Sequence, residues 1–471
     1  MKHIILVLAG LLIPGGAWAA DSAIAEDGML VVDGQRVFVL GLYENPPDEN
    51  LDQVAAAGFN LIHASADEAA LDRLWAKKMY AWINTGASID LSVDSESREA
   101  ALKRMVAGFS HHPALAVWEV PDEALWNVWY GATLWRRRDE PREQNALISQ
   151  LDNADLAAEL RDMRDQANAA FERGEPRVGE ELADEIWRRL DKTPPNPDLN
   201  LSNAPERAEQ MAAGMLQGYR VLKSIDPERP IWMNHAPRNS IAQLAEFNRA
   251  ADAVGCDIYP VPRSRHNGHS DLADKSLSCV GAYTQRMQEA APGKPVWMVL
   301  QGFGWPDISD ETDDQAKRDE LRRPTFEESR FMAYDAIVNG ARGILYWGTA
   351  YIEKDSGFWT DLLTLVAELS AQQPVLSAPD ADLDIDVTLA ETWGSVDRGV
   401  RVLPKQSGDK VHLLVVNEWS DPLVYTLHGL DALEGTSYRD PLTQQETIVQ
   451  HGTLTLSIRG FGVHVLEPEI P

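Results

Sequence analysis

Apolar residues along this chain follow two alternating patterns. Short runs rich in β-branched and aromatic residues alternate with longer segments in which apolar residues recur every three or four positions. The short runs predict strands, and the longer segments predict amphipathic helices. Eight such strands are predicted, at residues 36–43, 59–65, 79–86, 114–120, 230–235, 253–260, 294–303 and 343–349.

The predicted strands are of the buried kind. Several are apolar on both faces, as expected of strands that lie between a barrel interior and an outer layer of helices. The predicted helix at 327–340 ends in Gly340, which suits the position just past a helix C-terminus. Eight strands with intervening helices predict an α/β fold of the (β/α)8 TIM barrel type. A doubly wound open sheet is the alternative, and the absence of a glycine-rich phosphate loop after the first strand argues against it.

Three segments lie outside the strand and helix alternation. About 75 extra residues, 127–205, follow the fourth strand and carry charged helical runs. We interpret this insertion as a lid or cleft wall, or alternatively as a solvated helical hairpin without substrate contact. Short alternating segments beyond residue 377 predict a β-sandwich domain over 377–471, which leaves residues 20–376 for the barrel domain. Near the N-terminus, Asp33-Gly34 predicts the turn of a hairpin that caps the bottom of the barrel.

The first 19 residues have the character of a secretory signal peptide. Lys2 precedes an apolar stretch, which ends in the small-residue motif Ala17-Trp18-Ala19. The stretch is too short for a stable membrane span, and no later stretch reaches about 20 apolar residues. The sequence therefore predicts a soluble, exported protein, periplasmic or extracellular.

Charge and cysteine content narrow the class further. The formal net charge of -30 would repel a phosphate backbone, so we expect no nucleic-acid partner. Cys256 and Cys279 are the two cysteines, and either a single disulfide or two buried free thiols is compatible with their spacing. No metal-ligand spacing of cysteines is present, and we predict no metal and no cofactor. The oligomeric state stays open.

Reactive side chains gather at the predicted strand ends, where the active face of a barrel is built. Acids, amides and aromatic residues predominate there. Carboxylates and amides bind hydroxyl groups, and aromatic faces stack on sugar C–H surfaces, so the set points to a carbohydrate ligand. The candidate substrate-binding residues are Tyr43, Glu44, Asn84, His235, Tyr259, Gln301 and Trp347, and the candidate catalytic residues are Asp122, Glu123 and Asp257.

These positions resemble those of the clan A glycoside hydrolases. In that group an acid/base glutamate follows an amide residue at the end of strand four, and a nucleophilic glutamate ends strand seven. By this resemblance, AVWEVPDE supplies Glu123 as the acid/base, DIYP supplies the strand-six Tyr259, and LYWGT supplies the strand-eight Trp347. The resemblance covers roughly residues 28–350 and implies an exported glycoside hydrolase acting on an oligo- or polysaccharide.

Two positions depart from the clan A pattern. Asp122 stands where the amide is expected, and Gln301 stands where the nucleophile is expected. A glutamine cannot form a glycosyl ester, so three hypotheses follow. Asp122 and Glu123 act as the adjacent pair of N-acetylhexosaminidases, with the substrate's own 2-acetamido group as nucleophile, or Glu123 works with Asp257 or Glu44 as the base of an inverting mechanism. In the third hypothesis catalysis is lost, and the protein is a glycan-binding or cell-envelope scaffold.

Structural roles stand beside these functional ones. Asp122 suits a helix N-cap, Glu123 an exposed acid of a first helical turn, and His235 a satisfied core histidine. Asp257 suits an ion pair with an arginine of residues 263–265, and Gln301 and Trp347 suit packing at the barrel mouth. A metal-dependent hydrolase on a similar barrel is the least favoured class, because the histidines are scattered along the sequence.

Overall fold

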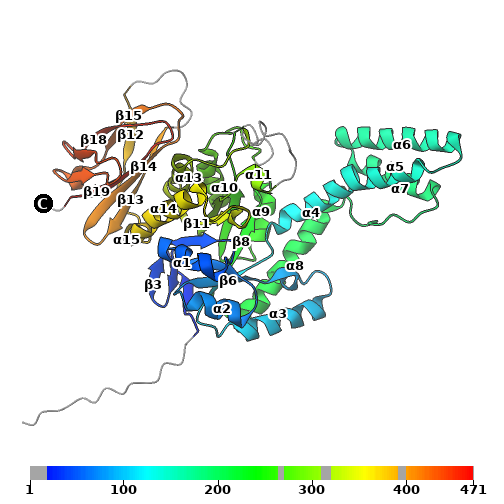
Figure 1. Ribbon diagram of the computed structural model, residues 1–471, viewed down its shortest axis with the longest axis horizontal. Coiled ribbons are helices and arrows are strands. Elements are labelled where there is room, and N and C mark those ends of the chain that lie inside the picture. The colour runs from blue at the N-terminus through cyan, green and yellow to red at the C-terminus, as the bar shows by residue number, and fades with distance from the viewer. Residues whose placement is uncertain (1–18, 264–269, 309–319, 391–398, 470–471) are drawn as a thin grey trace, which may run out of the picture.

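The computed structural model describes residues 19–263, 270–308, 320–390 and 399–469. Eight parallel strands close a barrel in the order β10, β11, β4, β5, β6, β7, β8, β9 (Figure 1). Each predicted strand segment contains or overlaps one of them, so the (β/α)8 barrel is confirmed and the open sheet is excluded. The strands are β4 (Val39–Leu42), β5 (Leu61–Ala64), β6 (Tyr80–Asn84), β7 (Leu115–Glu119), β8 (Ile231–His235), β9 (Ala253–Ile258), β10 (Val296–Gln301) and β11 (Ala341–Trp347).

Helices cover the outside of the barrel, as the sequence predicts. One of them, α13, is buried along nearly its whole length because the C-terminal domain packs on the side that faces away from the barrel. Gly340 follows this helix with φ +98°, which confirms its predicted place past the C-terminus. The outer helices are α1 (Asp48–Ala57), α2 (Glu68–Trp75), α3 (Ser95–Phe109), α8 (Ala204–Ile225), α9 (Ile241–Asn248), α10 (Cys279–Ala290), α13 (Phe326–Val338) and α14 (Gly357–Ala371).

Tryptophans fill the barrel interior. Trp82 and Trp232 meet edge to face with ring centroids 5.7 Å apart, and Trp232 and Trp297 lie 5.8 Å apart. Gly255 makes room for the Trp232 ring, because a Cβ at this position would stand 3.0 Å from Trp232 Nε1. Large side chains on some strands are thus matched by a glycine on a neighbour, which gives a packed core and no pore.

The N-terminal segment closes the bottom of this core. Strands β1 (Ser22–Ile24), β2 (Leu30–Val32) and β3 (Gln35–Val37) form a small antiparallel sheet. Asp33 and Gly34 both have positive φ at the turn between β2 and β3, which confirms the predicted hairpin. Leu30 and Val32 join the same apolar cluster as the barrel tryptophans.

The C-terminal domain consists of two antiparallel sheets, consistent with the predicted β-sandwich. Apolar side chains from both sheets form a separate core, which includes Leu413, Tyr425 and Leu466. One sheet holds β12 (Asp386–Leu389), β15 (Leu423–His428) and β18 (Leu454–Ile458). The other holds β13 (Val400–Ser407), β14 (Lys410–Asn417), β19 (Val463–Pro468), β16 (Ser437–Arg439) and β17 (Glu446–Ile448).

The insertion after β7 is helical and projects from the barrel (Figure 1). Helix α4 (Ala124–Leu134) and helix α8 lead out and back, and between them lie α5 (Glu140–Ile148), α6 (Ala154–Glu172) and α7 (Pro176–Arg189). The projecting helices share a small apolar cluster of their own. The role of the insertion as a lid or cleft wall stays a prediction, because α5, α6 and α7 extend away from the barrel in this structure.

Two further expectations concern the cysteines and the termini. Cys256 and Cys279 are both buried free thiols, so the two are not bridged in this structure. Among the described helices none combines the length and apolarity that a membrane crossing requires. Residues 1–18 of the predicted signal peptide lie outside the described residues.

Candidate active site

A cavity of about 200 Å³ opens at the carboxyl ends of the barrel strands. Strand ends and the loops that follow them supply its walls, because the carboxyl ends of parallel barrel strands all meet at one face. Six of the residues predicted from strand ends line this cavity together, namely Tyr43, Asp122, Glu123, Asp257, Tyr259 and Trp347.

Glu123 is held in the cavity wall by an unusual backbone conformation. Its φ of +49° lies in the left-handed region, and α4 begins at the next residue. Such a conformation costs a non-glycine residue on the order of 1–3 kcal/mol and is found where surrounding structure enforces it. Here the Glu123 N–H faces the Asn234 carbonyl at 3.3 Å. The reading of Glu123 as an exposed first-turn acid is therefore wrong.

Asp122 is held from the neighbouring strand and does not cap α4. Its carboxylate accepts a hydrogen bond from Asn234 Nδ2 at 2.9 Å, and no side chain caps the start of α4. Asn234 belongs to β8, so this bond ties the loops of two adjacent strands together. The N-cap reading of Asp122 is wrong, and its side chain faces the cavity.

Glu123 and Asp257 form a hydrogen-bonded carboxyl pair. Burial, followed by the neighbouring carboxylates of Asp257 and Asp122, raises the pKa of Glu123 to about 10. The pKa of Asp257 is raised to about 7, mainly by burial and then by Asp122, while the hydrogen bond from Glu123 opposes the rise. Glu123 therefore holds the shared proton at neutral pH and donates it toward Asp257.

Glu119 is a fourth buried carboxyl, which the sequence analysis missed. It ends β7 and is 1% exposed. Its Oε2 accepts hydrogen bonds from Asn84 Nδ2 at 2.8 Å and Trp82 Nε1 at 3.1 Å, and its Oε1 accepts one from the Tyr43 hydroxyl at 3.3 Å. Burial, followed by the charge of Asp122, raises its pKa to about 8, and these hydrogen bonds oppose the rise. A lone acid at the end of an otherwise apolar strand, LAVWE, is the sequence signal.

Glu119 gives the protein a measurable pH dependence of stability. A carboxyl whose pKa is higher in the folded state binds more protons there than in the unfolded chain, so stability falls as pH rises between the two pKa values. For Glu119 this window runs from about 4.3 in the unfolded chain to about 8 in the folded one. We expect Glu119→Gln to lose less unfolding free energy than the parent between about pH 5 and pH 8. Urea unfolding at both pH values measures this difference, and equal losses would contradict the assignment.

Aromatic rings form one side of the cavity. Tyr259 and Trp347 are stacked with centroids 5.6 Å apart and planes 18° from parallel, and Phe303 meets both rings edge on. Trp305 adds a further ring, and its Nε1 donates to the Val261 carbonyl at 3.0 Å. An aromatic wall beside a cluster of carboxyl groups matches the residue types expected for binding a sugar ring.

Gln301 lies behind this wall. It is fully buried, its Oε1 accepts from the Val261 N–H at 3.0 Å, and its Nε2 donates to the carbonyls of Val261 at 2.7 Å and Phe303 at 3.1 Å. These bonds to the main chain occupy both donors of the amide. Gln301 therefore positions the loop that carries the aromatic wall, and the expectation of direct substrate contact is corrected.

Three other predicted residues do not line the cavity. His235 is fully buried and shares a hydrogen bond with Asn248 Oδ1 at 2.8 Å, and burial lowers its pKa to about 4. It is a neutral core histidine. Glu44 is ion-paired with Lys354, and Asn84 donates a hydrogen bond to the Glu119 carboxyl. Among the described residues no group of three or more His, Cys, Asp or Glu could hold a metal ion.

The geometry of this barrel and its mouth can be set beside known proteins. No protein-family model and no curated protein matches the sequence. Solved structures do match. A β-galactosidase from Bacillus circulans sp. alkalophilus has a TM-score of 0.50 at 10% identity, with 92% of this chain and 99% of that chain covered. A family 5 glycoside hydrolase from Bacteroides vulgatus has a TM-score of 0.52 at 13% identity, with 95% and 93% covered.

A GH42 β-galactosidase has a TM-score of 0.52 at 9% identity, with 96% of this chain and 99% of that chain covered. The fold is that of these glycoside hydrolases. The match extends over nearly the whole length of both chains, so it includes the C-terminal domain as well as the barrel. At such low identity the likeness concerns the fold, and the chemistry has to be argued from the site.

Proposed function

We propose that this protein is an exported glycoside hydrolase in which Glu123 is the general acid and base. The observation that carries the proposal is the Glu123 carboxyl, buried beside those of Asp257 and Asp122 in the wall of a small, partly aromatic cavity at the barrel mouth. A general acid must keep its proton at the working pH until a leaving group takes it, and burial among other carboxyls provides that condition. Export rests on the N-terminal sequence.

The size of the cavity supports the binding of one sugar ring. About 200 Å³ is smaller than the roughly 300–1,000 Å³ of sites for drug-sized ligands. A single ring would stack on the Tyr259 and Trp347 side, with its reacting carbon toward Glu123. In that position the Glu123 proton would pass to the bridging oxygen, the C–O bond would break, and the ring would become positively charged.

The nucleophile in this proposal is the 2-acetamido group of the substrate. Gln301 is bound to the main chain and has no carboxylate to offer. Inversion needs carboxyl groups about 6.5–9.5 Å apart, with a water between them. Asp257 is instead in direct hydrogen-bond contact with Glu123, and Glu44 is ion-paired with Lys354 outside the cavity lining. Asp122, fixed by Asn234 beside Glu123, is placed to bind an acetamido N–H. The proposed substrates are therefore glycosides of 2-acetamido sugars.

A panel of nitrophenyl glycosides tests this function. The full chain is assayed with pairs of substrates that differ only in carrying a 2-acetamido or a 2-hydroxyl group. We expect release of nitrophenol from at least one acetamido substrate, at least about tenfold faster than from its hydroxyl partner. Equal rates for both members of every pair would exclude the acetamido route, and release from none would exclude a hydrolase acting on such glycosides.

A non-catalytic glycan-binding protein is the second candidate. The observation that favours it is Gln301 at the end of β10, the position at which the clan A pattern has its nucleophilic glutamate. A glycan array separates the two candidates: binding by the parent protein, with no hydrolysis of any bound glycan, supports the binding protein.

A further inference from the structure

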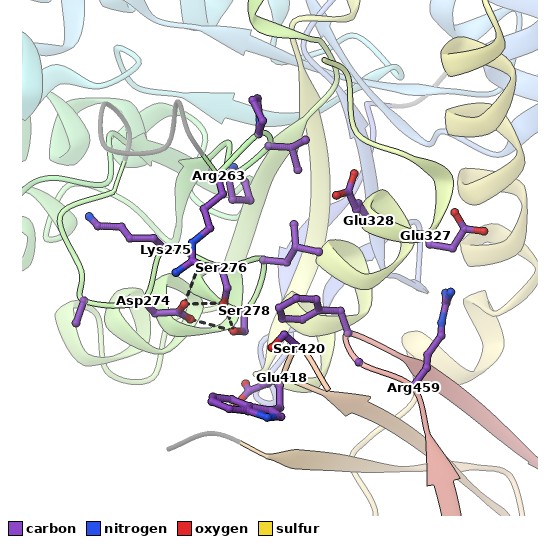
Figure 2. Close-up of a pocket in the computed structure, with 18 of the residues that line it drawn as sticks. Arg263, Asp274, Lys275, Ser276, Ser278, Glu327, Glu328, Glu418, Ser420 and Arg459 are labelled. Atoms are coloured by element: carbon purple, nitrogen blue, oxygen red, sulfur yellow. Dashed lines mark hydrogen bonds between the residues drawn. The ribbon is translucent and has the colours of Figure 1, made fainter. Parts of the chain in front are cut away.

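A second and larger cavity lies between the barrel and the C-terminal domain. Its volume is about 770 Å³, and Figure 2 shows its lining. The barrel contributes the loop after β9, the segment just before α10 and the start of α13, and the C-terminal domain contributes the turns after β14 and β18. We propose that this cavity binds a neutral oligosaccharide, namely a part of the substrate chain outside the catalytic cavity.

The two cavities share a wall. Tyr259 lines the catalytic cavity, and the next residues, Pro260 to Pro262, line the larger one. Gln301 fixes this segment through both the N–H and the carbonyl of Val261. A chain held in the larger cavity would therefore lie next to the residues that position the aromatic wall.

A buried carboxylate fixes one part of the cavity wall. Glu418 is 2% exposed, and its Oε1 is ion-paired with Arg401 Nε at 2.7 Å and accepts a hydrogen bond from Asn339 Nδ2 at 3.1 Å. Asn339 follows the last residue of α13. Glu418 therefore ties the turn after β14 to the end of α13, which holds the two domains together beside the cavity.

The charges around the cavity favour a neutral ligand. Four basic side chains, Arg263, Lys275, Arg322 and Arg459, stand with four acidic ones, Asp274, Glu327, Glu328 and Glu418. Although the whole chain has a net charge of -30, basic and acidic side chains are equal in number around this cavity. It offers both donors and acceptors to hydroxyl groups, and it favours neither a polyanion nor a polycation.

The C-terminal domain presents aromatic residues to the cavity on a rigid pair of turns. The Phe461 N–H donates to the Trp419 carbonyl at 2.9 Å, and Phe461 holds a φ of +48°, in the left-handed region. A Cβ on Gly460 would lie 1.9 Å from the Ser420 carbonyl, so the two turns are pressed together. Trp419 is half-buried in the cavity lining and offers a stacking face for a sugar ring.

This proposal rests on the proposed function for its choice of a glycan, and the experiment separates the two. Glu123→Gln serves as the non-hydrolysing parent, and N-acetylglucosamine oligomers of two to six units are titrated by calorimetry, with cellulose-derived oligomers as a second series. We expect the longer oligomers to bind at least about tenfold more weakly when Trp419→Ala or Arg459→Ala is added. Trp75→Ala is the matched control, since Trp75 is 38% exposed and lies at the end of α2, outside both cavities.

Hydrolysis of small nitrophenyl glycosides by the otherwise unchanged protein should stay within twofold in Trp419→Ala and in Arg459→Ala. The proposal would be overturned if both variants bound all oligomers as tightly as the parent. It would also be overturned if the parent bound no oligomer of either series. If the protein hydrolysed no glycoside, only the proposed function would be contradicted. The difference in oligomer affinity between the parent and the two variants would still test the larger cavity. Arg459 is exposed and forms no ion pair within the described residues, so its variant is the one expected to fold without change.

Discussion

Replacing Glu123 with glutamine should lower kcat/KM for a hydrolysed glycoside by about 10²–10⁴-fold and leave the fold intact. Glu123 already carries a proton at neutral pH, because burial and the neighbouring carboxylates raise its pKa to about 10. Glutamine is also neutral and of similar shape, and its amide can still donate toward Asp257. The variant therefore loses the transferable proton and little else.

Leaving-group dependence distinguishes a lost acid from a distorted site. Dinitrophenol leaves as a stable anion and needs little protonation, so its glycoside should lose far less rate in Glu123→Gln than one with an alkyl leaving group. Thermal unfolding of the variant checks the fold. Equal loss for all leaving groups would contradict the role of Glu123 as acid, and retained hydrolysis of the alkyl glycoside would refute it outright.

Replacing Gln301 with glutamate should destabilise the protein and should not restore a nucleophile. A protonated glutamate has one donor where the amide supplies two, so one of the carbonyls of Val261 and Phe303 loses its partner. We expect the free energy of unfolding to drop by about 1–3 kcal/mol in acid. Burial would raise the pKa of the new carboxyl, so the loss should grow as pH rises above about 4.

Urea unfolding of Gln301→Glu at several pH values measures this effect. Gln210→Glu is the matched control, because Gln210 is exposed on α8 and its change should have almost no effect. A Gln301→Glu variant as stable as the parent would contradict the role of the main-chain hydrogen bonds of Gln301. A variant that accumulates a glycosyl ester with a nitrophenyl glycoside would show that this side chain reaches the substrate.

The sequence predicted the barrel because its strand segments are short, apolar and separated by helical segments. The same reasoning placed the reactive face at the strand ends, and it brought Tyr43, Asp122, Glu123, Asp257 and Tyr259 into one cavity. What it could not supply was the turn after β7, where the left-handed conformation at Glu123 directs two consecutive acids into the same cavity.

Some of the misassigned residues could have been recognised from alternation along the strands. Side chains two apart share a face, so His235 lies opposite to Trp232 and Asn234 and points toward the outer helices. By the same rule Glu119 shares the inner face with Val117, which identifies it as a site carboxyl. Gln301 also shares the inner face, with Trp297 and Val299, and only the path of the loop at Val261 shows that its amide is used up by the main chain.

The contact between Trp82 and Glu119 gives this barrel a built-in optical probe. The indole N–H donates directly to the carboxyl oxygen, and both residues are shielded from solvent. When Glu119 loses its proton, the electric field along that indole changes while its surroundings stay dry. The near-ultraviolet absorption and emission of Trp82 would therefore follow the ionisation of Glu119 without any added label.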